Sequence, residues 1–193
     1  SQNEIQFQLD KDFRLTSAVA RQAIDADKYA SFVEEVKTLG RTAYFGPFRN
    51  ALNMATSNKH YDASISQRFI SDWHRWKTGS SKKDNLRAFA VEDGVRELLG
   101  FSQFEVNTPP EGNSLSLKID GHPFRLDEVG SGVCEILVIL ANAAFSQAAY
   151  ILIDEPELYL HPQAIEQVRV ALKQLSNEGY QIIFATHSAQ MVK

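Results

Sequence analysis

The stretch Tyr150-Ile-Leu-Ile-Asp-Glu-Pro156 places two adjacent carboxylates directly after an apolar run. A short, uninterrupted apolar run is typical of a strand that is buried on both faces of a parallel sheet. In open α/β sheets, ligands bind beyond the carboxyl ends of the strands. Asp154 and Glu155 therefore fall where a ligand site is expected, although the pair alone is interpreted equally well as an acidic turn.

A second apolar strand is expected at residues 181–185, after a helix at residues 162–176. Strand, helix and strand at this spacing predict a parallel βαβ unit whose two strands are covered on both faces. Parallel pairing brings His187 to the same sheet edge as Asp154 and Glu155. A lone histidine at a strand end is more often structural. Its position beside the two acids favours a functional interpretation, in which the imidazole donates a hydrogen bond to a phosphate or to attacking water.

The segment Gly130-Ser131-Gly132 precedes an apolar helix that is expected to run to about residue 145. Backbone N–H groups and a hydroxyl at a helix N-terminus form an anion site. An isolated segment of this kind is usually an ordinary turn. Ser131 lies 23 residues before Asp154, which leaves room for one helix and one strand. This spacing favours the anion site.

Turns and changes of periodicity divide the whole chain into three predicted segments, residues 1–50, 51–100 and 101–193. The first segment is expected to hold strands at 5–9 and 42–45 and a helix at 25–39. The second is expected to be an inserted helical arm or lid, with helices at 65–77 and 85–99 around a polar break at 78–81. The third adds strands at 103–106 and 115–119, with turns at 107–113 and 121–123.

Composition favours a globular protein, because 44% of the 193 residues are hydrophobic and 23% are charged. The net charge of -4 gives no overall basic field that would indicate nucleic acid binding. The single cysteine, Cys134, excludes an internal disulfide and fits a reducing compartment such as the cytoplasm. No apolar run is long enough for a membrane span, and the start shows no secretory signal. Because the sequence opens without methionine, we expect a fragment of a longer protein.

One basic stretch, residues 68–87, carries six Lys or Arg residues, two Asp residues and both tryptophans, Trp73 and Trp76. Basic side chains interleaved with aromatic rings suit the backbone and bases of a nucleic acid. The alternative is a solvated helix face whose tryptophans pack inward. We favour this second interpretation and keep DNA as a further expected partner.

Taken together, these motifs resemble the C-terminal part of ABC-type ATPase heads, and most closely the group of OLD-family ATPases, RecF and SMC-like proteins. Residues 130–132 match the signature motif, 151–155 match Walker B, 157–162 match the D-loop region, and His187 matches the switch histidine. Residues 44–49 are similar to an aromatic-Gly-Pro-x-Arg segment of OLD-like ATPases. The resemblance implies an α/β, partial P-loop NTPase fold of the ABC type, with a mostly parallel sheet, flanking helices and an inserted helical arm.

The resemblance also implies a role for each matching residue. Asp154 would support Mg²⁺, Glu155 would be the general base and His187 would contact the γ-phosphate of ATP. Ser131 and Gly132 would touch the γ-phosphate of ATP held by a second copy of the head, so a homodimer is expected. The nucleotide-binding set is completed by Gly130, Arg49 and His161, the last of which stands where transporter-type members carry Asp.

A phosphate-binding P-loop needs Gly-Lys followed by Ser or Thr, and none of the ten glycines is followed by Lys. In the resembled family this loop lies upstream of everything seen here, so we expect it on a part of the protein outside this chain. The expected function is an ATP-hydrolysing head that couples ATP-driven dimerisation to DNA processing, repair or phage defence. The alternatives are a catalytically silent dimerisation domain and a transporter ATPase subunit.

Overall fold

The chain divides into two compact units, Ser1–Thr42 and Ala43–Lys193. The structure, a computed structural model, describes residues 5–9, 15–20, 30–35, 41–46, 59–60, 63–64, 66–109, 114–146 and 148–192. In the first unit, β1 (Ile5–Leu9) pairs antiparallel with β2 (Leu15–Ala20). Residues 30–35 are helical, which confirms the centre of the helix predicted at 25–39, and the rest of that helix lies outside the described residues.

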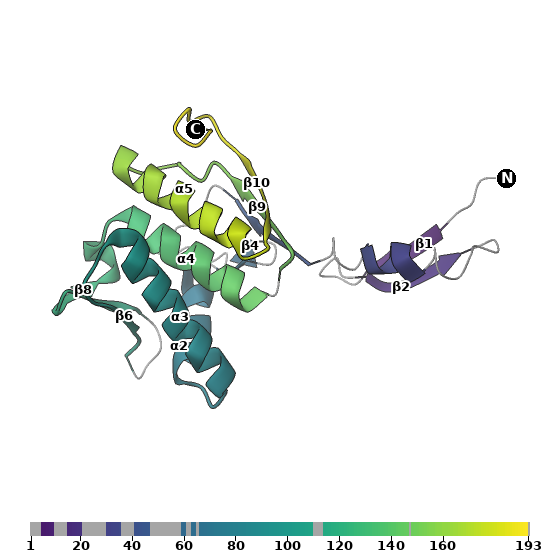
Figure 1. Cartoon of the computed structure of the whole chain (residues 1–193). Coiled ribbons are helices and arrows are strands. Elements are labelled where there is room, and N and C mark those ends of the chain that lie inside the picture. The colour runs from purple at the N-terminus through teal and green to yellow at the C-terminus, as the bar shows by residue number, and fades with distance from the viewer. Residues whose placement is uncertain are drawn as a thin grey trace. The chain divides into compact units, whose positions relative to one another are not determined.

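The parallel unit predicted from the two apolar runs forms the sheet of the second unit. Its strands are β3 (Thr42–Phe45), β9 (Tyr150–Asp154) and β10 (Gln181–Ala185), in the order β10-β9-β3. β9 and β10 are parallel, with Ala185 opposite Asp154, and α5 (Pro162–Asn177) connects them. Both strands therefore end at the same edge (Figure 1), as predicted.

The two faces of this sheet are covered unequally. On β9, Ile151 and Ile153 are buried, and their partners on β10 lie on the side against which α5 packs. On the opposite side, Ile183 is 60% exposed and stands beside Leu152. The prediction that both strands are covered on both faces is therefore wrong for β10. An apolar run indicates a strand but does not show whether the strand is central or at the end of its sheet. Among the described strands, β10 is at the end of its sheet.

Three helices pack side by side next to this sheet, with α4 (Ser131–Ser146) in contact with both α3 (Lys82–Leu99) and α5 (Figure 1). A fourth helix, α2 (Ser66–Thr78), packs on α3. α3 begins only a few residues after the end of α2, because Ser81 caps its N-terminus. The Ser81 hydroxyl accepts a hydrogen bond from the backbone N–H of Asp84 at 3.3 Å. The predicted arm thus contributes to the same hydrophobic core as α4, and the division at residues 50 and 100 stays a prediction.

A second, antiparallel sheet follows α3. It consists of β6 (Phe104–Asn107), β7 (Ser116–Ile119) and β8 (His122–Arg125), in that order. The turn between β7 and β8 is Asp120-Gly121, both with positive φ. The prediction that His122 and Pro123 belong to this turn is wrong, since both lie in β8. Proline is tolerated there because β8 is at the end of its sheet, where a missing N–H donor breaks no ladder.

Three further short elements are described in the second unit. β4 (Lys59–His60) pairs with β5 (Ala63–Ser64), and a 3-10 turn, η1 (Leu126–Glu128), leads from β8 into α4. Within the described part of the chain, none of the helices has both the length and the apolar character that a bilayer span requires.

Candidate functional site

The two adjacent acids stand at the carboxyl end of β9, where the backbone turns sharply. Glu155 has a φ of 48°, in the left-handed region, and its N–H donates to the carbonyl oxygen of Ala185 at 2.9 Å. This conformation costs a non-glycine residue about 1–2 kcal/mol, and such costs cluster at functional sites. Because of this turn, the backbone at Glu155 no longer follows the direction of the strand that ends at Asp154. The hydrogen bond from Glu155 to Ala185 connects the turn to the end of β10.

His187 meets Glu155 at this edge, as the sequence predicts. The imidazole Nε2 lies 3.4 Å from Oε1 of Glu155. The imidazole is 90% exposed and the Glu155 side chain is 31% exposed. An exposed imidazole that touches a half-buried carboxylate leaves both groups accessible to a ligand from solvent. Such a pair can accept a proton from water and donate a hydrogen bond to an anionic oxygen.

A third carboxylate, which the sequence analysis did not assign to the site, holds the loop that carries His187. Oε1 of Glu157 accepts hydrogen bonds from the Thr186 hydroxyl at 2.6 Å and from the N–H groups of His187 and Ser188 at 2.8 and 3.0 Å. Burial raises the pKa of the Glu157 carboxyl, but these hydrogen bonds outweigh it and hold the pKa below its usual value. One clue was available: this acid follows Glu155 by two residues, and a Thr-His-Ser sequence ends the neighbouring strand.

Among the predicted signature residues, Ser131 contacts the turn at 156–160. The hydroxyl of Ser131 donates to the carbonyl oxygen of Tyr159 at 3.2 Å. Gly130 is exposed, and a side chain there would meet open space. His161 is exposed as well and precedes α5 at its N-cap position, without a capping hydrogen bond from its side chain. These three residues line a surface that a second molecule can reach.

Gly132 differs from its neighbours because it is buried. A Cβ added there would lie 2.7 Å from the Cβ of Ala164, a distance that real carbon atoms do not adopt. The glycine therefore allows α4 and α5 to approach closely at their N-terminal ends. This packing explains the residue type, and a contact between Gly132 and a nucleotide stays a prediction.

Two further predictions concern the nucleotide and the metal. Arg49 lies outside the described residues. Within those residues, no group of three or more His, Cys, Asp or Glu side chains forms a cage for a metal ion. Magnesium usually binds through one or two carboxylates together with substrate phosphates and water, so Asp154 at the strand end fits such a shared site.

Cys134, on the buried side of α4, is 2% exposed, and burial raises the pKa of its thiol to about 11. A thiol with so high a pKa remains protonated at neutral pH and is a poor nucleophile. Cys134 is therefore a core residue.

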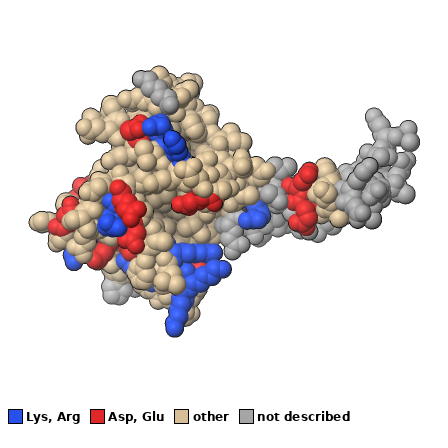
Figure 2. All heavy atoms as spheres, viewed as in Figure 1, with Lys and Arg blue, Asp and Glu red and all other residues tan. Residues whose placement is uncertain are grey.

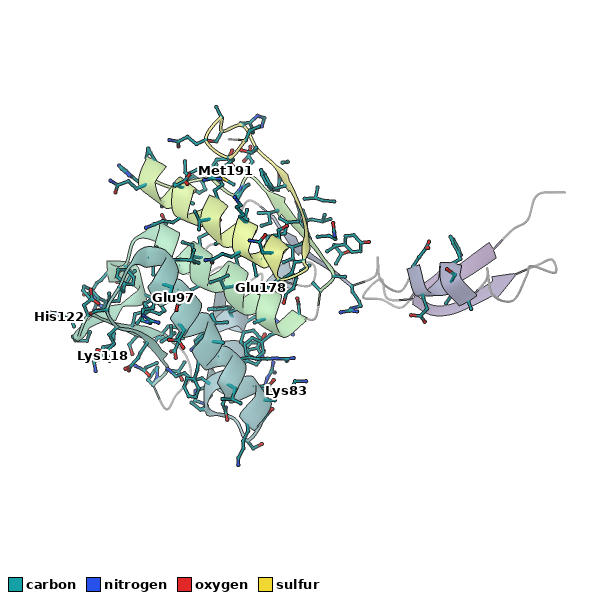
Figure 3. All side chains as sticks on the ribbon, viewed as in Figure 1. Lys83, Glu97, Lys118, His122, Glu178 and Met191 are labelled. Carbon is teal, nitrogen blue, oxygen red and sulfur yellow. The ribbon has the colours of Figure 1, made fainter. Side chains whose placement is uncertain are left out.

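Most of the basic residues at 68–87 form ion pairs with acids. Arg68 and Arg75 pair with Asp72, at 3.5 and 2.6 Å. Lys77 pairs with the buried Glu92 at 2.5 Å. The described structure contains no salt bridge of Lys82 or Lys83, which lie exposed in the first turn of α3. Figure 3 shows Lys83 there, at one end of the molecule's second unit, and Figure 2 shows a group of basic side chains over the same region.

Both tryptophans of this stretch pack inward, which confirms the favoured interpretation. Trp73 is fully buried, and its indole N–H donates to the carbonyl oxygen of Val106 at 3.3 Å. Trp76 is 9% exposed and stacks on Phe145, with ring centroids 4.0 Å apart. Neither ring is available for stacking on a base.

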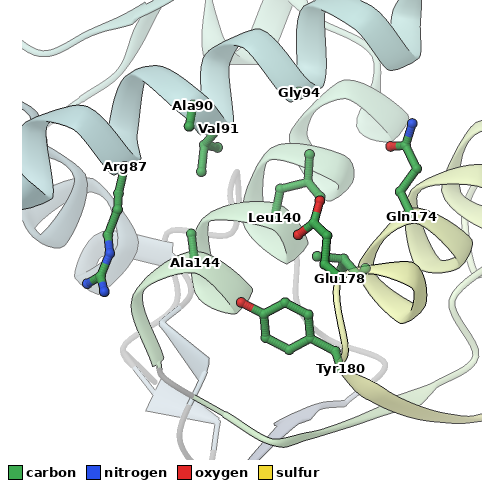
Figure 4. Close-up of a pocket in the computed structure, with 10 residues that line it drawn as sticks. Arg87, Ala90, Val91, Gly94, Leu140, Ala144, Gln174, Glu178 and Tyr180 are labelled. Atoms are coloured by element: carbon green, nitrogen blue, oxygen red, sulfur yellow. The ribbon is translucent and has the colours of Figure 1, made fainter.

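A shallow pocket of about 180 Å³ opens between α3, α4 and α5, away from the predicted site. Figure 4 shows Leu140 of α4, Glu178 and Tyr180 among the residues that line it, with Arg87 of α3 farther to the left. The Tyr180 hydroxyl donates to the carbonyl oxygen of Ala143 at 3.1 Å. None of the residues predicted to bind nucleotide or metal lines this pocket, so it plays no part in the candidate site.

Comparison with known proteins identifies a family and two similar nucleases. The model of the family described as "AAA domain, putative AbiEii toxin, Type IV TA system" matches residues 45–192. The Old nuclease of Escherichia phage P2 is 64% identical over 42 residues, which are 22% of this chain and 7% of that protein. The OLD nuclease of Thermus scotoductus is 31% identical over 120 residues, 58% of this chain and 22% of that protein. The chain thus spans less than a quarter of either nuclease.

The fold has a parallel among solved structures. The SMC head domain from Thermotoga maritima superimposes with a TM-score of 0.50 at 13% identity, over 98% of this chain and 61% of that one. At this identity the likeness concerns the fold alone. Together with the family match, it confirms the predicted resemblance to ABC-type ATPase heads of the OLD and SMC-like group.

Proposed function

Because the chain belongs to this AAA-domain family, and its fold is that of an ABC-type ATPase head related to OLD nucleases, we propose that it supplies the hydrolytic half of an ATP site in a longer protein. The observation that carries this proposal is the contact between Glu155 and His187 at 3.4 Å, at the shared carboxyl edge of two parallel strands. The phosphate-binding loop would come from a part of the protein outside this chain.

In the proposed reaction, water attacks the γ-phosphate of ATP and ADP leaves. Glu155 accepts a proton from the water, and His187 donates a hydrogen bond to a γ-phosphate oxygen, where negative charge accumulates. Asp154 would hold Mg²⁺, which neutralises charge on the phosphates when it is bound. All three side chains lie at or just beyond the ends of β9 and β10, which are parallel and adjacent.

Ser131 has a separate role in this proposal. Its hydroxyl points to the carbonyl oxygen of Tyr159, within the turn that precedes α5. Gly130 and His161 are exposed nearby. We assign this surface to ATP held by a second copy of the head, so that two copies would enclose two nucleotides. The dimer would then form when ATP binds and would open after hydrolysis.

The first test measures ATP hydrolysis by the full-length protein as a function of Mg²⁺ concentration. For Asp154→Asn, we expect the Mg²⁺ concentration at half-maximal hydrolysis to rise about 10- to 100-fold. This is the usual loss of metal affinity when a group that supports a metal ligand is substituted. Glu166→Gln, an exposed carboxylate on α5, is the matched control and should behave as the original protein. If the full-length protein shows no Mg²⁺-dependent turnover, the proposal fails and a silent dimerisation domain becomes the better interpretation.

DNA is the proposed target of the nucleotide cycle, as in DNA processing, repair or phage defence. The support in this chain is limited to Lys82 and Lys83 at the start of α3. We expect the double variant Lys82→Glu/Lys83→Glu to weaken DNA binding by the full-length protein. The slope of the logarithm of affinity against the logarithm of salt concentration should fall by about 1 for each lysine that contacts a phosphate. An unchanged slope would show that these lysines are only a solvated helix end.

A further inference from the structure

The loop at residues 186–188, which carries His187, is held at its backbone by a single carboxylate oxygen. Oε1 of Glu157 accepts the Thr186 hydroxyl and the N–H groups of His187 and Ser188. We propose that Glu157 is a positioning residue for ATP hydrolysis, which fixes His187 relative to Glu155. The proposal rests on the proposed ATPase function but concerns a residue to which that function assigns no role.

The contacts of Glu155 and Glu157 with His187 are complementary. Glu155 touches the imidazole, with Nε2 and Oε1 3.4 Å apart, whereas Glu157 binds the backbone N–H of the same residue at 2.8 Å. The imidazole is 90% exposed, so the surrounding protein does little to restrict its orientation. The hydrogen bonds from the backbone of the loop to Glu157 are therefore important for the position of the His187 imidazole.

The support from which Glu157 reaches this loop is itself a tight turn. The N–H of Leu158 donates to the carbonyl oxygen of Glu155 at 3.0 Å, and the N–H of Leu160 donates to that of Glu157 at 3.1 Å. Tyr159 adopts a φ of 64° within the turn. A carboxylate mounted on such a turn cannot easily follow the 186–188 loop if the loop moves, so it defines the position of the loop.

The chemistry of the three donors explains why a carboxylate stands here. The N–H groups of His187 and Ser188 follow the end of β10 and have no ladder partner within the described sheet. A carboxylate is an acceptor only, and hydrogen bonds to a charged acceptor are stronger than those to a neutral one. The other oxygen, Oε2, is buried without a hydrogen-bond partner among the described residues. Retaining a charge in that setting is costly and indicates that the three bonds to Oε1 matter.

The test compares Glu157→Ala with Glu157→Gln in the full-length protein. Alanine removes all three accepted hydrogen bonds, whereas the carbonyl oxygen of glutamine can occupy the place of Oε1 and keep them. We expect Glu157→Ala to lower kcat about 10- to 100-fold, the usual effect of displacing a catalytic group by about 1 Å. KM for ATP should change less than kcat, because the hydrogen bond from His187 to the γ-phosphate is expected to be strongest in the transition state, where negative charge accumulates. Glu157→Gln should recover most of the activity, and Glu166→Ala serves as a surface control.

A second readout does not depend on turnover. Hydrogen exchange at the backbone amides of His187 and Ser188 should accelerate in Glu157→Ala and remain slow in Glu157→Gln. Should Glu157→Ala fail to fold, Thr186→Val is expected to lower kcat by itself. This substitution keeps the shape of the side chain but removes the hydroxyl that donates to Glu157 and that accepts the N–H of Ser188 at 2.9 Å. Normal kcat in a folded Glu157→Ala variant would overturn the inference, whatever the amide exchange shows.

The two proposals fail in different ways. If the unmodified protein hydrolyses no ATP, the proposed function is lost, but faster amide exchange in Glu157→Ala would still support the positioning of the loop. If the unmodified protein and Glu157→Ala hydrolyse ATP equally well, the proposed function stands and the role of Glu157 is overturned.

Discussion

Glu155→Gln in the full-length protein is expected to reduce steady-state ATP hydrolysis by about 100- to 10,000-fold, the usual contribution of a general base. Glutamine cannot accept the proton of the attacking water. It has the size of glutamate and offers an oxygen to His187, which lies 3.4 Å from the native carboxylate. The architecture of the site should therefore survive, and ATP binding should persist. Phosphate release and equilibrium binding of ATP, measured on the same preparation, check both parts.

The control for this experiment is Glu166→Gln, since Glu166 undergoes the same chemical change on the exposed side of α5. Undiminished hydrolysis in Glu155→Gln would remove this residue from the role of general base. Simultaneous loss of hydrolysis and of ATP binding would indicate that Glu155 mainly supports the turn after β9. A structural role of this kind is plausible on physical grounds, because Glu155 holds the turn in a left-handed conformation with a φ of 48°.

Trp73→Ala is expected to lower the free energy of unfolding by about 3–5 kcal/mol, the range for truncating a large buried aromatic side chain. The ring is fully buried and lies 6.0 Å from that of Phe69. The substitution leaves a cavity and deprives the carbonyl oxygen of Val106 of its indole donor, which lies 3.3 Å away. Urea-induced unfolding, followed at several denaturant concentrations, measures the loss.

Leu86→Ala provides the comparison, because Leu86 lies on α3 with 68% of its surface exposed. Its substitution should change the unfolding free energy by less than about 0.5 kcal/mol. The pair of variants separates core packing from nucleic-acid stacking. If Trp73→Ala unfolds at the normal denaturant concentration and instead loses affinity for DNA, the stacking interpretation of the basic stretch must be restored.

The parts of the fold that could be predicted are those encoded in local pattern. The apolar runs of β9 and β10 and the helix between them are contiguous in the sequence, and parallel pairing then determines which ends meet. This is why the proximity of Glu155 and His187 could be derived before any coordinates were known. The inward packing of Trp73 and Trp76 was also foreseeable, since aromatic residues among charges on a helix usually face the core.

The features that escaped prediction depend on contacts between distant segments. No pattern around Gly132 reveals that Ala164 lies where its Cβ would be. The three hydrogen bonds of Glu157 likewise require the exact register of the 156–160 turn against the end of β10. The exposure of Ile183 reflects what covers its face of β10, and the sequence of the strand carries no sign of it. Pro123 lies in β8 and not in the predicted turn, because the position of β8 at the end of its sheet is invisible in the sequence.

The described groups of the site, from Ser131 to Ser188, belong to one continuous stretch of the chain. The bond between Ser131 and Tyr159 closes a loop of 28 residues, and that between Glu157 and His187 closes one of 30. The entropy lost on closing such loops increases only with the logarithm of their length, by about 0.6 kcal/mol for each doubling. During synthesis, this half of the site can therefore assemble as soon as β10 is available, and extra residues placed before α4 lengthen neither loop.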